Sequence, residues 1–347
     1  MRRDHRKFRY EFWEGAALLA AVLAIVFSVN GWYAYQEKKA LKSLSESWAE
    51  TEQEPGSEAE KSLIEYEGKK YRRNTYVKAI LLMGIDRKGT LEENRVTGSG
   101  GQADGIFLIA HDTVRDSVRI LLIPRDTMTP ITLTDLSGNV LGKDIQHLTL
   151  AYAYGDGREK SCRYMKEAVT ELLGGLGIDG YIALGMEALP VLNDTVGGVT
   201  VTIEEEGLAA ADPAFVKGEK VLLKGNQAER YVRYRDIKIA QSALTRTERQ
   251  KTYIAGFVQA AKRKARDEEG VITRLLEEAQ PYMVTDLSKG QYMDMALGFL
   301  KSSQDFGQED MVTLPGEAVE TNLYDEYYPY QEEILPIVLD FFYREEG

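Results

Sequence analysis

The chain has 347 residues and a formal net charge of −12, from 43 basic and 55 acidic side chains. This acidic balance argues against nucleic acid as a partner. Its single cysteine, Cys162, excludes an internal disulfide and a CxxC motif, and its three histidines argue against a multi-histidine metal site.

The N-terminus predicts a membrane anchor. Residues 1–14 are basic and residues 15–35 are almost entirely apolar. About 20 apolar residues cross the hydrocarbon core of a bilayer, and a basic flank stays in the cytoplasm. No small-x-small cleavage motif follows the apolar run, so we expect an uncleaved single-pass helix rather than a signal peptide. The N-terminus is then cytoplasmic, and the rest of the chain lies outside the cell membrane.

Residues 36–75 are polar and charged, with a break at Pro55 and Gly56. Such a composition is typical of a linker, so we expect a stalk that separates the membrane from an extracellular domain at residues 76–347.

The extracellular part alternates strand and helix patterns. Short apolar runs predict buried strands at residues 77–85, 105–110, 118–123 and 199–203. Apolar spacing of three and four predicts helices at residues 160–173, 186–196, 246–264, 271–279, 291–301 and 331–343. This alternation predicts a layered α/β/α domain with a central sheet. The segment from Ser302 onward is strongly acidic and is predicted to be a solvated tail.

Charged side chains lie at the ends of the first three predicted strands. Asp86 and Arg125 follow two of them, whereas Asp104 precedes the other. Ligands of open α/β sheets bind beyond the carboxyl ends of the strands. Asp104 can join this edge only if its strand runs antiparallel to the others, or if the Gly-rich loop at residues 98–101 folds back. Taken alone, an aspartate at a strand end is more often a turn or cap residue.

Residues 229–251 carry seven Lys or Arg against three acids, in a chain whose overall charge is negative. Arg233 and Arg235 would share one face of an extended segment, and Arg246 and Arg249 one face of a helix. Planar guanidinium groups match phosphate oxygens. The cluster predicts a phosphate or pyrophosphate site, although charge runs in general are more often solvated faces.

A capping pattern supports the same interpretation. Thr245 and Glu248 fit the S/T-x-x-E box, which would begin a helix near Arg246. The free N–H groups of that first turn would then face the same anion.

Two common enzyme motifs are absent from the sequence. It contains neither a GxxxxGK[ST] phosphate loop nor a GxSxG nucleophile elbow. Residues 98–103 nearly match the dinucleotide fingerprint, but they enter a predicted strand rather than a helix.

As an ordered set, these blocks resemble the LytR-CpsA-Psr family of bacterial cell-wall glycopolymer transferases. The blocks that carry the resemblance are Leu82-Met83-Gly84-Ile85-Asp86, Ala103-Asp104, Leu122-Ile123-Pro124-Arg125-Asp126-Thr127, Ala151-Tyr152-Ala153-Tyr154-Gly155, Gly197-Gly198-Val199, Arg233-Tyr234-Arg235 and Arg246-Thr247-Glu248-Arg249-Gln250. No motif beyond Gln250 carries it.

The resemblance implies a mixed central sheet between helical layers and a hydrophobic channel for a polyprenyl chain. It implies transfer of a glycan-1-phosphate from a polyprenyl-pyrophosphate carrier onto peptidoglycan, assisted by Mg²⁺. It assigns Asp86 and Asp104 to the metal and, with Arg125, to catalysis. The implied pyrophosphate-binding residues are Arg125, Arg233, Arg235, Arg246, Arg249 and Gln250. Gln102 stands where the family usually has arginine, so it can donate a hydrogen bond to phosphate but brings no charge.

Two other functions fit the same residues. A non-catalytic scaffold would bind polyprenyl pyrophosphates without releasing product. A pyrophosphatase would release the lipid-linked phosphate to water without an acceptor. A transcriptional regulator fits poorly, because the predicted external domain is acidic.

Overall fold

The computed structural model describes residues 63–93, 96–235, 242–321 and 325–346. The predicted cytoplasmic segment (residues 1–14) and membrane anchor (residues 15–35) lie outside these ranges. Within them, no helix is both long and apolar enough to span a bilayer.

A six-stranded sheet forms the centre of the fold. Its strand order is β11-β8-β3-β4-β5-β12. The strands are β3 (Val77–Ile85), β4 (Ala103–Asp112), β5 (Ser117–Leu122), β8 (Gly180–Gly185), β11 (Met283–Thr285) and β12 (Met311–Thr313). β3 runs antiparallel to β4 and parallel to β8, and β5 is antiparallel to β4 and parallel to β12. The expected mixed sheet is therefore confirmed.

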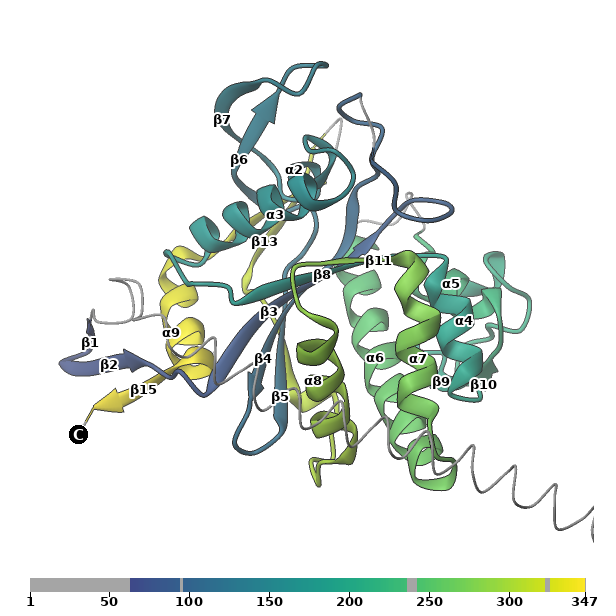
Figure 1. The fold of residues 1–347 in the computed structure, drawn as a ribbon. Coiled ribbons are helices and arrows are strands. Elements are labelled where there is room, and N and C mark those ends of the chain that lie inside the picture. Colours follow the sequence, from purple (N-terminus) through teal and green to yellow (C-terminus); the bar gives the residue numbers. More distant parts are fainter. Residues whose placement is uncertain (1–62, 94–95, 236–241, 322–324, 347) are drawn as a thin grey trace, which may run out of the picture. The chain divides into compact units, whose positions relative to one another are not determined.

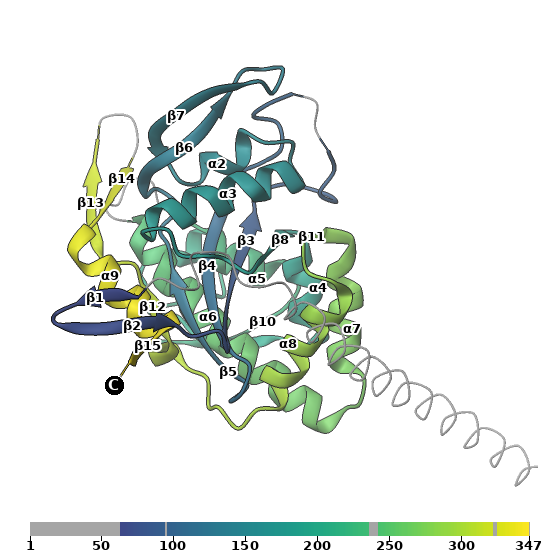
Figure 2. The same cartoon turned by 60° about the vertical axis from the view of Figure 1, so that its left-hand side comes forward.

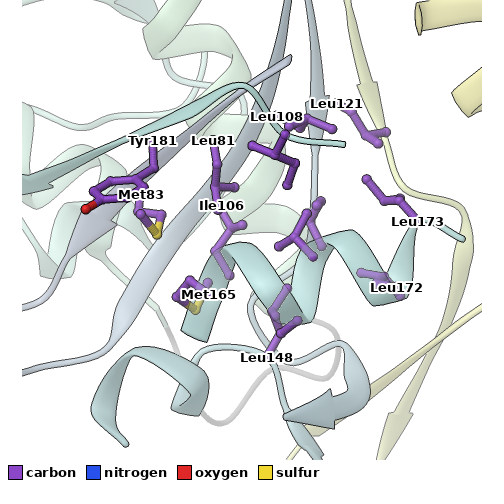
Figure 3. Close-up of a cluster of buried hydrophobic side chains, with 14 of the residues drawn as sticks. Leu81, Met83, Ile106, Leu108, Leu121, Leu148, Met165, Leu172, Leu173 and Tyr181 are labelled. Atoms are coloured by element: carbon purple, nitrogen blue, oxygen red, sulfur yellow. The ribbon is translucent and has the colours of Figure 1, made fainter. Parts of the chain in front are cut away.

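Helical layers cover both faces of this sheet (Figures 1 and 2). On one face, alternate residues of β3 such as Leu81 and Met83 pack in one cluster with Met165 of α3 (Glu159–Leu172) and with α9 (Gln331–Phe342) (Figure 3). On the other face, strand residues such as Phe107 of β4 pack against Val258 of α6 (Ser242–Asp267), and α8 (Lys289–Lys301) covers Ile80. Continuous apolar strands are what a sheet buried on both faces requires.

A smaller unit packs on the outer side of α6. It contains β9 (Val199–Thr202), β10 (Lys220–Leu223), α4 (Ala188–Thr195), α5 (Asn226–Arg233) and α7 (Val271–Ala279). The strand expected at residues 199–203 is therefore present, but it pairs with β10 in a separate two-stranded sheet.

The expectation of a linker through residue 75 is wrong for its last part. β1 (Ile64–Tyr66) and β2 (Lys69–Arg73) form a hairpin, and β15 (Tyr343–Glu346) pairs with β2. The polar side chains there lie on exposed or half-buried strand positions, where polarity does not oppose strand formation.

The prediction of a solvated acidic tail is also wrong. Residues after Ser302 form β12, the hairpin of β13 (Gly316–Glu320) and β14 (Asp325–Pro329), and α9. Ile334, Val338 and Phe342 of α9 are buried in the main core. The helix expected at residues 331–343 is confirmed, and its acids occupy exposed positions, so the overall charge concealed only its burial in the core.

Helix α6 begins at Ser242, before the expected start near Arg246. Thr245 and Glu248 therefore lie inside the helix, and the predicted capping box is wrong. Oε1 of Glu248 instead lies 2.9 Å from Nζ of Lys251, so the two side chains form an ion pair. In addition, an unpredicted hairpin of β6 (Met128–Thr134) and β7 (Val140–His147) projects from the domain (Figures 1 and 2).

Candidate functional site

Asp86 and Asp104 lie side by side at one edge of the central sheet. Because β3 and β4 are antiparallel, Ile85 pairs with Ala103. The backbone N–H of Asp86 donates to the carbonyl oxygen of Gln102 over 2.8 Å. Of the two routes open from the sequence, the antiparallel strand is the one that brings Asp104 to this edge.

Gly101 allows this close approach. Its φ is +92°, a left-handed conformation, and a Cβ there would lie 3.0 Å from the carbonyl oxygen of Asp86. A side chain would strain the backbone and push the loop away from β3. Gly101 therefore allows the loop to hold Gln102 and Asp104 beside Asp86.

Arg125 is held by three side chains. Its guanidinium donates to Asp104, to Gln102 Oε1 over 3.2 Å and to Asp126 over 3.1 Å. The backbone of Arg125 is fixed by the N–H of Thr149, which donates to its carbonyl oxygen over 3.0 Å. Gln102 thus uses its acceptor oxygen on Arg125, which leaves its amide nitrogen as the group that can donate to a ligand.

Arg246 is buried, with 8% of its surface exposed. Among the residues that the structure describes, no carboxylate lies within ion-pair distance of it. Burial lowers the pKa of Arg246, and Arg125 also lowers it, whereas Asp104 raises it. A buried cation without a paired anion is costly, and such groups occur where a charged ligand binds.

Arg246 lines a cavity of about 10 Å³, room for roughly one water. One part of its wall is polar, from Asp104, Arg125, Arg246, Thr247 and Gln250. The rest is apolar, from Ile106, Phe107, Leu122, Ile123 and Pro124. Gln250 thus lies beside Arg246, and charged groups meet apolar groups between the sheet and α6.

Arg233 and Arg235 have different partners. Arg233 is the last residue of α5, so the expected extended segment is wrong at this position. Its guanidinium donates to Asp86, and to Glu229 one turn earlier over 2.8 Å. Arg235 donates to Asp325 at the start of β14. The hairpin β13–β14, which the sequence did not connect with the site, therefore reaches one of its arginines.

Arg249 contacts other groups than the Asp104–Arg125 pair does, and it does not line the cavity beside Arg246. Nε of Arg249 lies 3.3 Å from Oε1 of Glu205, and its guanidinium donates to the carbonyl oxygen of Tyr234. Burial lowers the pKa of Arg249 while Glu205 raises it, and burial raises the pKa of Glu205. Glu205 is a partner that the sequence interpretation missed, and its only signal was the acidic run after the strand at residues 199–203.

Two carboxylates at neighbouring strand ends suit a small hard cation. Mg²⁺ is usually held by one or two carboxylates together with substrate phosphates and water. Asp86 and Asp104 meet that requirement, and the described parts of the chain hold no cluster of three acidic, histidine or cysteine ligands. The donor set fits a metal that shares its coordination with a substrate.

The LytR_cpsA_psr family model matches residues 36–337. A similar curated protein is the polyisoprenyl-teichoic acid–peptidoglycan teichoic acid transferase TagU of Bacillus cereus (strain AH820), 27% identical over 300 residues, which are 85% of this chain and 86% of that protein. TagU of Bacillus mycoides (strain KBAB4) is 33% identical over 157 residues, 45% of this chain and 44% of that protein.

Solved structures share the fold. A Streptococcus agalactiae protein, gbs0355, matches with a TM-score of 0.59 and 22% identity, over 77% of this chain and 87% of that chain. TagV of B. subtilis matches with a TM-score of 0.56 and 18% identity, over 77% of this chain and 98% of that chain.

Proposed function

The chain belongs to the LytR_cpsA_psr family, and we propose that it is a membrane-anchored phosphotransferase that attaches a glycopolymer to peptidoglycan. The donor is a glycan linked to a polyprenyl pyrophosphate. Teichoic acid is the favoured glycan class, because similar curated proteins are named teichoic acid transferases.

The observation that carries the proposal is that two arginines, Arg125 and Arg246, line one cavity between the sheet and α6. Arg246 is buried without a carboxylate partner among the described residues, and it lines the same cavity as Arg125. A diphosphate would supply the missing negative charge, and two guanidinium groups match its oxygens. The cavity has room for roughly one water, so a diphosphate would enter only as the side chains around Arg125 and Arg246 move apart, and the apolar residues of its wall would then face the first carbons of a polyprenyl chain.

The reaction moves one phosphoryl group. A hydroxyl oxygen of peptidoglycan attacks the phosphorus that carries the glycan, and the bond from that phosphorus to the bridging oxygen breaks. Polyprenyl phosphate leaves, and the new bond is a phosphodiester. Arg125 and Arg246 stabilise the charge that develops on the leaving phosphate.

Asp86 is the better placed of the two aspartates to accept the proton of the acceptor hydroxyl. Its side chain is 43% exposed, compared with 11% for Asp104. An acceptor that arrives from solvent can therefore reach Asp86. Mg²⁺ held by the two carboxylates would supply further neutralisation of phosphate charge.

The anchor completes the proposal. Residues 15–35 would cross the cell membrane once, with residues 1–14 in the cytoplasm and the folded domain outside. This arrangement would bring the domain to a carrier whose lipid chain lies in the bilayer.

The test uses the full chain in detergent or vesicles, with a labelled polyprenyl-pyrophosphoryl glycan, Mg²⁺ and peptidoglycan. We expect polyprenyl phosphate to be released only when the acceptor is present. Release without an acceptor would favour a pyrophosphatase. Tight donor binding without release, with several donors and acceptors, would favour a scaffold.

A further inference from the structure

The tip of the β6–β7 hairpin exposes large apolar side chains. Leu136 is 76% exposed, Leu141 70% and Val140 61%. The hairpin projects beyond the body of the domain (Figures 1 and 2). Apolar side chains gathered on a projecting tip, rather than scattered singly, mark a surface that binds something apolar.

The turn at this tip is well fixed. The carboxylate of Asp135 accepts hydrogen bonds from the backbone N–H groups of Ser137 and Asn139, each over 2.9 Å, and from Asn139 Nδ2 over 2.9 Å. These hydrogen bonds fix the backbone conformation of the turn at residues 135–139. Leu136 and Val140 therefore stay exposed in a defined conformation.

A second segment extends the same surface. The hydroxyl of Thr97 donates to the carbonyl oxygen of Asp135 over 2.8 Å, and its neighbour Val96 is 54% exposed. Val96, Leu136, Val140 and Leu141 together are called the apolar tip below. The exposed apolar surface is therefore built from two separate segments, the loop at Val96 and the hairpin turn.

The base of the hairpin belongs to the candidate site. β6 begins at Met128, shortly after Arg125. At the end of β7, His147 Nε2 lies 3.0 Å from the carbonyl oxygen of Asp325, whose carboxylate pairs with Arg235. The apolar tip therefore extends from the same end of the sheet as the arginines.

We propose that the apolar tip inserts into the outer face of the membrane and holds the site at the depth of the carrier's diphosphate. This inference rests on the proposed function, which requires a donor embedded in the bilayer. Residues 36–62 separate the predicted anchor from Leu63 and reach at most about 90 Å when fully extended. That length sets an upper limit on the distance between the domain and the bilayer, and the tip would set which end of the sheet faces the membrane.

Charges of both signs lie near the tip. Lys160 Nζ donates to the carbonyl oxygen of Gly138, within the turn, over 2.8 Å. Lys143, on β7, is half exposed and paired with Glu171, and its neighbour Asp144 is also exposed. The apolar side chains, and not a net charge, therefore carry the match to a lipid interface.

The test measures insertion directly. The full chain would be incorporated into phosphatidylglycerol–phosphatidylethanolamine vesicles, with an environment-sensitive dye on Leu141→Cys or on Val114→Cys. Val114 is 69% exposed and follows β4 at the opposite end of the sheet, so it is a matched control. Native Cys162 is buried and should not react. With brominated lipids we expect the Leu141 probe to lose about half of its emission and the Val114 probe to lose almost none.

Equal emission of the Leu141 probe in brominated and ordinary lipids would overturn the proposal. So would a blue shift that depends on protein concentration but not on bromine, which would assign the tip to a second copy of the chain. A Leu136→Ser/Val140→Ser/Leu141→Ser variant should lose roughly tenfold in turnover of a vesicle-embedded donor but keep turnover of a short-chain soluble donor. Because quenching needs no turnover, the insertion test stands apart from the proposed chemistry.

Discussion

The guanidinium of Arg125 donates to the carboxylate of Asp104 at the edge of the central sheet. The neighbouring Asp86 has the same kind of partner in Arg233. Both carboxylates proposed for Mg²⁺ are therefore paired with arginines proposed for the donor. A diphosphate that draws the arginines away would free the carboxylates, and a cation on the carboxylates would free the arginines.

We accordingly expect Mg²⁺ and diphosphate to bind cooperatively. Inorganic pyrophosphate should raise the affinity for Mg²⁺ by roughly tenfold, and Mg²⁺ should raise the affinity for pyrophosphate by the same factor. Calorimetric titration of each in the presence of the other would measure this, with the affinity of pyrophosphate for Mg²⁺ in solution subtracted. Asp104→Asn should reduce the coupling, and Asp116→Asn, at the far end of the sheet, should not. If Mg²⁺ and pyrophosphate bound independently to the wild type, the arginines would not be exchanging the carboxylates for the diphosphate.

Removing the buried charge of Arg246 should separate stability from activity. Arg246→Met fills similar space without an unpaired buried cation, so we expect stability to rise by about 1 kcal/mol or more. Turnover should fall by roughly 100-fold or more, because the leaving phosphate loses a cation. Denaturant melts and donor turnover would measure the two effects. Arg115→Met removes an exposed arginine and should change neither. A destabilised variant would mean that Arg246 has a structural role.

Gly101→Ala should disturb the site through the backbone. At φ +92° and with 3.0 Å to the carbonyl oxygen of Asp86, alanine should cost about 1 kcal/mol or more and displace Gln102 and Asp104. We expect at least a roughly tenfold fall in turnover. Gly68→Ala is the control, since its φ is +75° but nothing lies within 4 Å. If both variants lost activity equally, general strain would be the cause.

Protonation of His111 should destabilise the fold in acid. His111 is buried, and within the described residues neither ring nitrogen has a hydrogen-bond partner. Burial lowers its pKa, against smaller opposite effects of Asp116, Asp294 and Asp112. The unfolded chain takes up a proton below about pH 6.5, before the folded protein does, so stability falls as the pH drops below that value.

His111→Leu should therefore lose less stability between pH 7.5 and pH 5.5 than the wild type does. Denaturant midpoints at the two pH values would show the difference. An identical pH dependence in both proteins would mean that other groups control acid stability.

Local patterns predicted β3, β4 and β5 of the central sheet but not β8, β11 or β12. Residues 77–85 were placed without error because a strand buried on both faces is apolar throughout, and residues 271–279 because helical spacing was clear. The sequence allows two arrangements for Asp86 and Asp104, since their meeting depends on strand direction. That direction is set by pairing between distant segments.

The errors have a common origin in long-range contacts. Arg249 has the expected spacing from Arg246, yet Glu205, distant in sequence, sets its orientation. The S/T-x-x-E pattern at Thr245 resembles a helix start, but α6 begins earlier. Acidic residues after Ser302 suggested a solvated tail, whereas Phe342 is fully buried. Charge counts describe exposed positions and say little about the apolar residues between them.

The path from β2 into β3 has a mechanical consequence. Any pull on the chain ahead of Leu63 passes along β2 and enters the sheet at Val77, the first residue of β3. β3 is hydrogen-bonded to β4 along one side and to β8 along the other. A force along the strand would therefore load many hydrogen bonds at once in shear, instead of peeling them one by one. Asp86 lies just past the far end of that strand, so these hydrogen bonds stand between Asp86 and a force applied at Val77.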